Sequence, residues 1–353
     1  MKIKVNIGRL WLLAISCWLL AGCSTIDDDL SDCGSSYQLD YELKLVTNMT
    51  TELTTQLSMV TDVSLSTALK THLSTVFTDY AHDVDLAFYD IEGDSIRLQH
   101  DEHIMDANQA SYTLNLPKRQ YMHLAAANIV NNQTVGIVND NLCHKAKLVQ
   151  AATDTINSHS TGVFTARHSM EVLEGIDQTF NVHLYMANCA ATLVIDPNGH
   201  NDFTDIKVFT TGFASEYNIC DSTYQFAPKS PIVRTKRTDG DVNGEYCFTS
   251  VNFPSRVPII NNNARSIIDT GDGFDSGETN EELWQYRVYI TKPDGTTTET
   301  ILGIHEILLP GQLKVVKVRL TDDGAAEPVN KPQEVTVSVT LDWKDGGSYN
   351  GEF

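Results

Sequence analysis

Apolar and polar residues alternate along most of this chain, and the alternation predicts short β-strands. From residue 37 to residue 45, every second residue is Tyr or Leu, which is the period of two expected of a half-buried strand. Similar segments follow, many of them closed by Gly, Pro, Asp or Asn. The segments predicted as strands are 84–89, 96–98, 112–116, 121–130, 180–186, 191–195, 206–210, 246–253, 286–290, 297–301, 313–320 and 335–343.

One segment instead has the period of a helix. Apolar residues recur there at spacings of three and four, and Ser64 precedes them as a candidate N-cap. The pattern predicts an amphipathic helix of about four turns over residues 65–80. The apolar residues are Leu65, Leu69, Leu73, Val76, Phe77 and Tyr80.

Many short strands separated by turn signals favour β-sandwiches over βαβ units. The clearest hairpin joins 286–290 to 297–301 through Pro293-Asp294-Gly295, because Asp-Gly supplies the backbone angles of a tight turn. The chain exceeds one ordinary domain, and residues 143–177 have few regular apolar patterns. We therefore predict an N-terminal sandwich over 37–170, which includes the helix, and a C-terminal sandwich over 171–353.

The first 22 residues have the pattern of an export signal. Lys2, Lys4 and Arg9 precede an apolar run at 10–20, which is shorter than a membrane span of about 20 residues. The segment 20–23, Leu-Ala-Gly-Cys, resembles a bacterial lipobox. We expect residues 1–22 to be removed and Cys23 to carry lipid; the alternative is a plain secretory signal with an accidental Cys. Acyl chains contribute about 0.8 kcal/mol per buried CH₂, so several of them hold a protein firmly on a bilayer.

Residues 23–36 read as a lipidated acidic tether. Asp27, Asp28 and Asp29 follow Cys23 closely, and this run resembles the surface-export signal of Bacteroidetes lipoproteins. A flexible, solvated tether is the alternative, and both interpretations can hold together.

The net charge limits the kinds of binding partner, and the number of cysteines limits the disulfides that can form. The net charge is −21, and loss of three basic residues with the signal lowers it to about −24. Such acidity argues against nucleic acid or anionic lipid as a partner. Without Cys17 in the signal and Cys23, five cysteines remain, and their pairing is left open because an odd number leaves at least one unpaired. They are Cys33, Cys143, Cys189, Cys220 and Cys247.

Candidate chemistry is sparse. The segment His100-Asp101-Glu102-His103 lacks the spacing of an HExxH zinc site, and we interpret it as a solvated turn. The segment 269–278 resembles a Ca²⁺ loop in composition but not in EF-hand spacing. The chain contains no GxSxG, Walker A or GxGxxG motif. The sequence therefore predicts no catalytic residue, no metal, no cofactor and no small-molecule substrate.

Several segments follow one another in a distinctive order: Cys23 with 28–33, the strand at 37–46, the helix at 65–80, and the segments 81–90, 121–125 and 335–347. Their order and spacing resemble the FimB-type fimbrial anchor lipoproteins of Bacteroidales. The resemblance implies two tandem transthyretin-like (Greek-key) β-sandwich domains. It also implies a non-enzymatic role at the base of a fimbria, in the outer membrane, with fimbrial pilin subunits as partners. Some relatives are instead tip or accessory subunits.

One feature of the family is missing. A second Cys often lies in the strand after the helix, where it could bridge to the position of Cys33, but residues 84–90 contain none. That bridge is therefore not expected, and a link between Cys33 and Cys143 stays open.

Subunits of such a fibre can join by strand addition, in which an extended segment pairs with an unpaired sheet edge. We predict that either the C-terminal segment from Val335 onward or the first strand at 37–45 lies at this exchange surface; the alternative is that both are ordinary strands of their own chain. The alternating residues of the C-terminal segment are Val335, Val337, Val339, Leu341 and Trp343.

A competing function is a surface glycan-binding lipoprotein of a nutrient-uptake system. Such proteins usually present a flat aromatic platform. After signal removal, Trp284 and Trp343 are the tryptophans left, and each falls in a predicted strand where a core position is expected.

Overall fold

The computed structural model describes residues 36–46, 63–76, 81–92, 95–104, 111–130, 132–150, 153–176, 178–238, 244–256, 282–329 and 335–343. These residues form several β-sheets and the α-helix α3 (Val63–Val76), which confirms the predicted fold class, mainly β with tandem sandwiches. The helix begins one residue before Ser64, so Ser64 lies inside it rather than at its N-cap. In the described part of the chain, α3 and every other helix fall short of the length and apolarity that a bilayer crossing needs.

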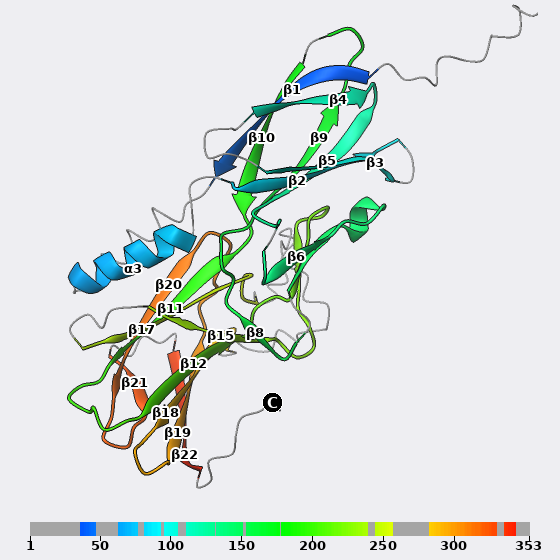
Figure 1. Ribbon diagram of the computed structural model, residues 1–353. Helices are drawn as coiled ribbons and strands as arrows, with labels where there is room; N and C mark the ends of the chain where they lie inside the picture. Colours follow the sequence, from blue (N-terminus) through cyan, green and yellow to red (C-terminus); the bar gives the residue numbers. More distant parts are fainter. Residues whose placement is uncertain are drawn as a thin grey trace, which may run out of the picture.

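A seven-stranded sheet occupies one end of the molecule (Figure 1). Its strands are β1 (Ser36–Val46), β2 (Asp83–Asp90), β3 (Arg97–Ile104), β4 (Ser111–Pro117), β5 (Gln120–Ala127), β9 (Phe164–Glu171) and β10 (Gln178–Met186). The strand order is β3-β2-β5-β9-β10-β1-β4. The β9–β10 pairing covers two positions, and buried side chains of β2 and β5 share one core with those of β10. The sheet therefore folds over into a sandwich.

A four-stranded sheet with the order β14-β13-β7-β6 covers the opposite face of β2 and β5. It contains β6 (Val135–Val138), β7 (Lys147–Gln150), β13 (Glu216–Asn218) and β14 (Thr223–Gln225), with the short 3₁₀ helix η2 (Cys143–Lys145) before β7. Its core contacts include Ala87 and Tyr89 of β2. Since β6 and β7 come early in the chain and β13 and β14 come late, this sheet connects the two halves of the protein.

The other end of the molecule is a sandwich of two further sheets. The five-stranded sheet contains, in order, β16 (Lys236–Arg237), β17 (Tyr246–Asn252), β11 (Cys189–Asp196), β20 (Leu313–Leu320) and β21 (Ala326–Pro328). The six-stranded sheet contains, in order, β22 (Val335–Trp343), β19 (Thr297–Ile304), β18 (Trp284–Thr291), β12 (Asp205–Thr211), β15 (Ile232–Arg234) and β8 (Thr155–Asn157). The predicted hairpin is confirmed as β18–β19, and Gly295 has a φ of 82° in its turn.

Helix α3 lies beside β11, β17 and β20 in Figure 1. Its buried residues Leu69 and Leu73 belong to the same core cluster as Val194 of β11 and Cys247 of β17. The other face of β11 points into the sandwich core with Leu193. A strand covered on both faces ordinarily buries apolar side chains on both, which explains why β11 reads as a nearly continuous apolar run.

The division of the chain at 170/171 stays a prediction. The sheets show that β10, which follows this point, pairs with β1 in parallel. Two earlier strands, β7 and β8, pair with β13 and β15 from later in the chain. The segment 143–177, which lacks a regular apolar pattern, thus contains η2, β7, β8 and β9.

Candidate functional site

The C-terminal candidate for strand exchange forms an edge strand. β22 pairs antiparallel with β19 and ends its sheet. The register places Val335 opposite Ile304 and Val337 opposite Leu302, and a shift occurs near the far end, between Thr297 and Glu299. No described strand pairs with the other side of β22, so its outer N–H and C=O groups are the kind that accept an added strand. An exchange role for Val335, Val337, Val339, Leu341 and Trp343 stays a prediction.

Strand β19, which pairs with β22, has one buried face. In β19, Thr298, Thr300, Leu302 and Ile304 are all buried. Leu302 and Ile304 belong to the core cluster of the C-terminal sandwich. Any strand that occupies the place of β22 therefore gains backbone hydrogen bonds to β19 beside an apolar core.

The N-terminal candidate is placed differently. β1 lies between β10, with which it is parallel, and β4, with which it is antiparallel. Both of its backbone sides are paired, so a partner strand could reach it only after displacing β4 or β10. The topology therefore favours β22 over β1 as an exchange edge.

The N-terminal residues assigned to anchoring lie outside the described residues. These are Cys23, Asp27, Asp28 and Asp29, and the Ca²⁺-like loop at 269–278 also lies outside. Trp284 is described and is 2% exposed. Its Nε1–H donates a hydrogen bond to the carbonyl of Glu306 at 2.9 Å, so it is a core residue, as expected, and does not form a surface platform for sugars.

Four cysteines of the described region are free thiols. Cys143 and Cys220 are neighbours in the core under the four-stranded sheet. Their mutual hydrogen bond, together with burial, raises the pKa of the Cys143 thiol, and the same contact lowers the pKa of Cys220. Cys189 is buried in the core of the C-terminal sandwich, and Cys247 is buried in the core that β17 shares with helix α3 and the seven-stranded sheet. Cys33 lies outside the described residues, so the disulfide pattern stays open.

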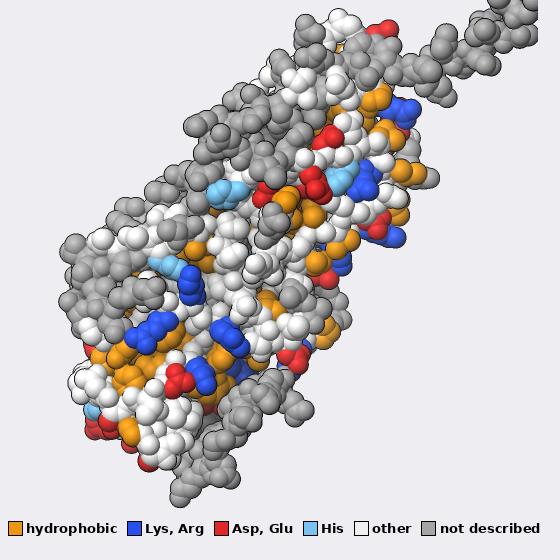
Figure 2. Space-filling view, viewed as in Figure 1, with side chains coloured by type: hydrophobic (Ala, Val, Ile, Leu, Met, Phe, Trp, Pro, Cys, Tyr) orange, Lys and Arg blue, Asp and Glu red, His pale blue; other side chains and the backbone are white. Residues whose placement is uncertain are grey.

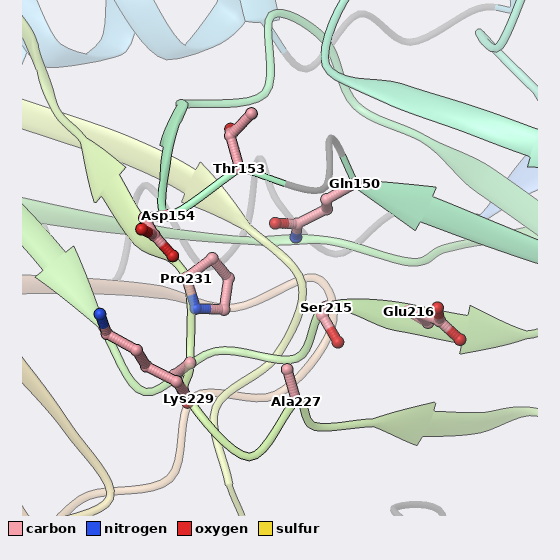
Figure 3. Close-up of a pocket in the computed structure, with 9 residues that line it drawn as sticks. Gln150, Thr153, Asp154, Ser215, Glu216, Ala227, Lys229 and Pro231 are labelled. Carbon is pink, nitrogen blue, oxygen red and sulfur yellow. The ribbon is translucent and has the colours of Figure 1, made fainter. Parts of the chain in front are cut away.

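A small cavity of about 270 Å³ lies where the two halves of the chain meet. Figure 3 shows Gln150 at the end of β7 facing Asp154 and Ser215 across it, with Lys229 below. Gln150 donates a hydrogen bond to the carbonyl of Ala214 at 3.1 Å. Beside the cavity, Lys147 and Glu216 form an ion pair at 2.6 Å between β7 and β13. These contacts hold the two halves together.

Basic residues gather on one part of this acidic protein. Figure 2 shows Lys and Arg side chains together with apolar ones in the region of β11 to β17. Arg234, Lys236 and Arg237 are exposed there, and the guanidinium of Arg237 lies 4.7 Å from the centre of the Tyr246 ring. This group of exposed basic residues is a local exception to the negative charge of the whole chain.

A polar cluster joins β2, β3 and the loop after β6. His100 Nε2 lies 2.7 Å from Asp85 Oδ2, and Asn139 Nδ2 lies 2.8 Å from the same oxygen and 3.0 Å from His100 Nε2. Glu102 Oε1 lies 3.9 Å from His100 Nε2. Asp85, His100 and Glu102 are close enough to share a metal ion.

The sequence interpretation of this segment as a solvated turn was wrong, because His100 to His103 lie in strand β3. Strand alternation puts His100 and Glu102 on one face, and pairing with β2 brings Asp85 to them. Sequence reasoning missed Asp85 and Asn139 as neighbours. An Asp within the apolar strand 84–89 was the one signal that pointed to such a contact.

The sandwiches, the connecting sheet and the edge strand β22 define a β-sandwich protein built of several sheets. The chain belongs to the family of fimbrillin-A associated anchor proteins Mfa1 and Mfa2, whose family model matches residues 51–344. This is a family of fimbrial anchor proteins, not of enzymes, and it confirms the resemblance found in the sequence. No curated protein sequence matches the chain.

Several solved structures are similar to this chain at low identity. A candidate adhesin from Bacteroides ovatus is 12% identical, with a TM-score of 0.51 over 86% of this chain and 97% of that chain. The fimbrial anchor protein Mfa2 from Porphyromonas gingivalis is 12% identical, with a TM-score of 0.42 over 86% and 98%. The tip fimbrial protein Mfa3 from the same organism is 11% identical, with a TM-score of 0.38 over 87% and 100%. At such identity, the first likeness shows the fold alone.

Proposed function

We propose that this protein is a non-catalytic structural subunit of a cell-surface fimbria, anchored in the outer membrane through lipidated Cys23 and joined to neighbouring pilins by strand addition. The observation that carries the proposal is the family match over residues 51–344. The open edge of β22 supports the mode of joining.

Anchoring rests on the N-terminal pattern. A basic segment, a short apolar run and the lipobox-like residues 20–23 precede an acidic stretch. Lipid on Cys23 would fix the protein to the membrane, while residues 24–35 would separate the folded region from the lipid. A fibre that ends on such a subunit is retained on the cell.

Joining by strand addition rests on the geometry of the six-stranded sheet. β22 is the last described strand of the chain and pairs on one side, with β19. A pilin strand pairs with the free side of β22 and so extends the six-stranded sheet by one strand. Main-chain hydrogen bonds supply affinity, and the alternate side chains supply specificity.

Cells that carry a deletion of residues 335–353 test the joining mode. We expect normal amounts of the protein at the membrane but none in purified fimbriae, because the exchange edge is lost. A matched variant with Leu98→Ala, an exposed position 46% accessible on β3, should assemble normally. Unchanged incorporation of the deletion variant would overturn strand addition at this edge.

The Cys23→Ala variant tests anchoring. If the protein is a basal anchor, the variant should release fibres that contain it into the medium, whereas wild-type fibres stay on the cells. If wild-type protein instead fractionates with sheared fibre ends and Cys23→Ala fibres stay attached, a tip or accessory position replaces the basal one. Absence from fibres, combined with retention on an oligosaccharide column, would favour the glycan-binding alternative.

A further inference from the structure

In the polar cluster formed by Asp85, His100, Glu102 and Asn139, three close contacts cannot all be hydrogen bonds at the same time. Asp85 Oδ2, His100 Nε2 and the Asn139 amide nitrogen lie 2.7, 2.8 and 3.0 Å from one another. An ionised carboxylate only accepts hydrogen bonds, an amide nitrogen only donates them, and the imidazole nitrogen does one or the other. In every such arrangement, one of the three contacts joins two donors or two acceptors.

Exchanging the oxygen and nitrogen of the Asn139 amide does not remove the conflict. The oxygen would then face the carboxylate of Asp85 at the same short distance. Asp85 is 2% exposed, so water has little access to weaken the repulsion, and buried polar atoms ordinarily have matching partners. With the Asn139 amide turned so that its oxygen faces the pair, and with His100 Nε2 unprotonated, three lone-pair atoms converge on one point, which is the arrangement of a metal site.

The distances fit a transition-metal ion. Zinc binds imidazole nitrogen and carboxylate oxygen at about 2.0–2.2 Å. The donor atoms around a tetrahedral zinc ion are therefore about 3.4 Å apart, so the three atoms, which lie 2.7 to 3.0 Å apart, need to separate by only about 0.5 Å to admit the ion. Glu102 Oε1, 3.9 Å from His100 Nε2, needs a small movement to become the fourth ligand, and its side chain is 59% exposed and free to make it.

We propose that Asp85, His100, Asn139 and Glu102 form a binding site for a divalent transition-metal ion, with zinc as the preferred ion. The donor set is one imidazole, two carboxylates and one amide oxygen. Imidazole favours zinc over magnesium and calcium, which take oxygen ligands. This inference is independent of the proposed fimbrial role.

The ion would join three parts of the fold. Asp85 belongs to the interior strand β2, His100 and Glu102 to the edge strand β3, and Asn139 to the loop after β6. The loop already touches β3, since Arg97 N donates to the carbonyl of Asn141 at 2.7 Å. A bound ion would fasten the edge strand to the sheet and to the four-stranded sheet above it, which is a way of protecting an exposed edge.

Isothermal titration of the full-length protein with Zn²⁺, after treatment with a chelator, tests the site. We expect one saturable site and a melting temperature that rises when zinc is added. The His100→Ala variant should bind zinc at least tenfold more weakly, and Glu102→Gln several-fold more weakly. The Asn139→Asp variant should bind more tightly than wild type, because a carboxylate replaces a neutral amide oxygen.

A matched control separates this site from surface histidines in general. His200 is half-buried and lies 3.2 Å from the exposed Asp322, and no third ligand joins this pair among the described residues, so His200→Ala should leave zinc binding unchanged. Folding of each variant is checked by its far-UV circular dichroism. Wild-type protein that fails to bind zinc with one-to-one stoichiometry, or a folded His100→Ala variant that binds as tightly as wild type, overturns the proposal.

Discussion

The central strands β2 and β11 are buried to the same extent but by different chemistry. In each strand the first seven of eight residues are buried. Each is covered on one face by a sandwich core and on the other by an additional layer, which is the four-stranded sheet over β2 and helix α3 over β11. β11 fills this position with small and aliphatic residues and one Thr, whereas β2 places two aspartates there.

The two aspartates of β2 are matched by specific partners. Asp83 Oδ1 accepts hydrogen bonds from the backbone N–H groups of Ile129 and Val130, at 2.8 and 3.0 Å. Asp85 faces His100 and Asn139. A buried carboxylate without partners would destabilise the fold strongly. β11 is therefore stabilised by the packing of apolar side chains, whereas β2 also positions a loop and a polar cluster through hydrogen bonds.

The largest expected effect on stability is in β11, the strand that is stabilised by apolar packing. Leu193 of β11 is 0% exposed in the C-terminal core. Leu193→Ala should lower the free energy of unfolding by about 3 kcal/mol, because it removes apolar contacts and leaves a cavity. Urea denaturation at pH 7 and pH 5.5 measures it, and the loss should be equal at both. Leu98→Ala, at an exposed position, should change stability by less than about 0.5 kcal/mol.

Asp83→Ala tests the corresponding claim for β2. The buried backbone N–H of Ile129 and the half-buried N–H of Val130 would lose their acceptor, and we expect a loss of about 2 kcal/mol in the free energy of unfolding. Asp83→Asn keeps an oxygen at this place and should lose clearly less. If both variants are equally destabilised in urea denaturation, the backbone contacts are not the source of the effect.

Many of the strands could be predicted from the local pattern of apolar and polar residues, but their pairing could not. The alternation at 313–320 and 335–343 marks strands because each of these has polar residues at every second or third position. The segment at 164–171 was missed, since Arg167, His168 and Ser169 form an exposed run in its middle. Pairing was not predictable either: β1 lies parallel to β10, more than a hundred residues later.

The two candidate sites also differ in how far the sequence could predict them. The strand at 335–343 could be predicted from sequence because one segment contains the whole feature, although its place at a sheet edge could not. The polar cluster combines Asp85, His100 and Asn139 from two strands and a loop. Its existence depends on the antiparallel register that sets Asp85 opposite Glu102, and a one-residue slip would send the side chains of β3 to the other face.

Strand β5, which pairs with β2, contains a buried histidine that makes stability depend on pH. His123 of β5 is buried, its ring stacks on Phe88 at 4.3 Å, and its Nδ1–H donates to the carbonyl of Ala87 at 3.1 Å. Burial lowers the pKa of His123 from 6.5 to about 3, opposed by the bond to Ala87 and assisted weakly by His168. The folded protein therefore holds this ring neutral.

Below pH 6.5 the unfolded chain gains a proton at this ring that the folded chain binds only near pH 3. Stability is thus fully present above pH 6.5 and falls as the pH is lowered towards 3, with about 1 kcal/mol lost between pH 7 and pH 5.5. Urea denaturation of His123→Phe should lack this part of the loss, while exposed His144→Gln should retain it. An identical pH dependence in His123→Phe and wild type would contradict the assignment.

The smallest effect is expected where β11 carries its own polar contact. The hydroxyls of Thr192 and Thr249 lie 3.1 Å apart, both buried, on adjacent strands. Thr192→Val leaves the Thr249 hydroxyl without this partner and should lower the free energy of unfolding by about 0.5 kcal/mol. The double variant Thr192→Val with Thr249→Val replaces both hydroxyls by methyl groups of the same shape and should recover wild-type stability. A double-mutant cycle in urea provides the test: if the double variant is less stable than the single one, β11 depends on a directed contact as β2 does, and the contrast between the two strands fails.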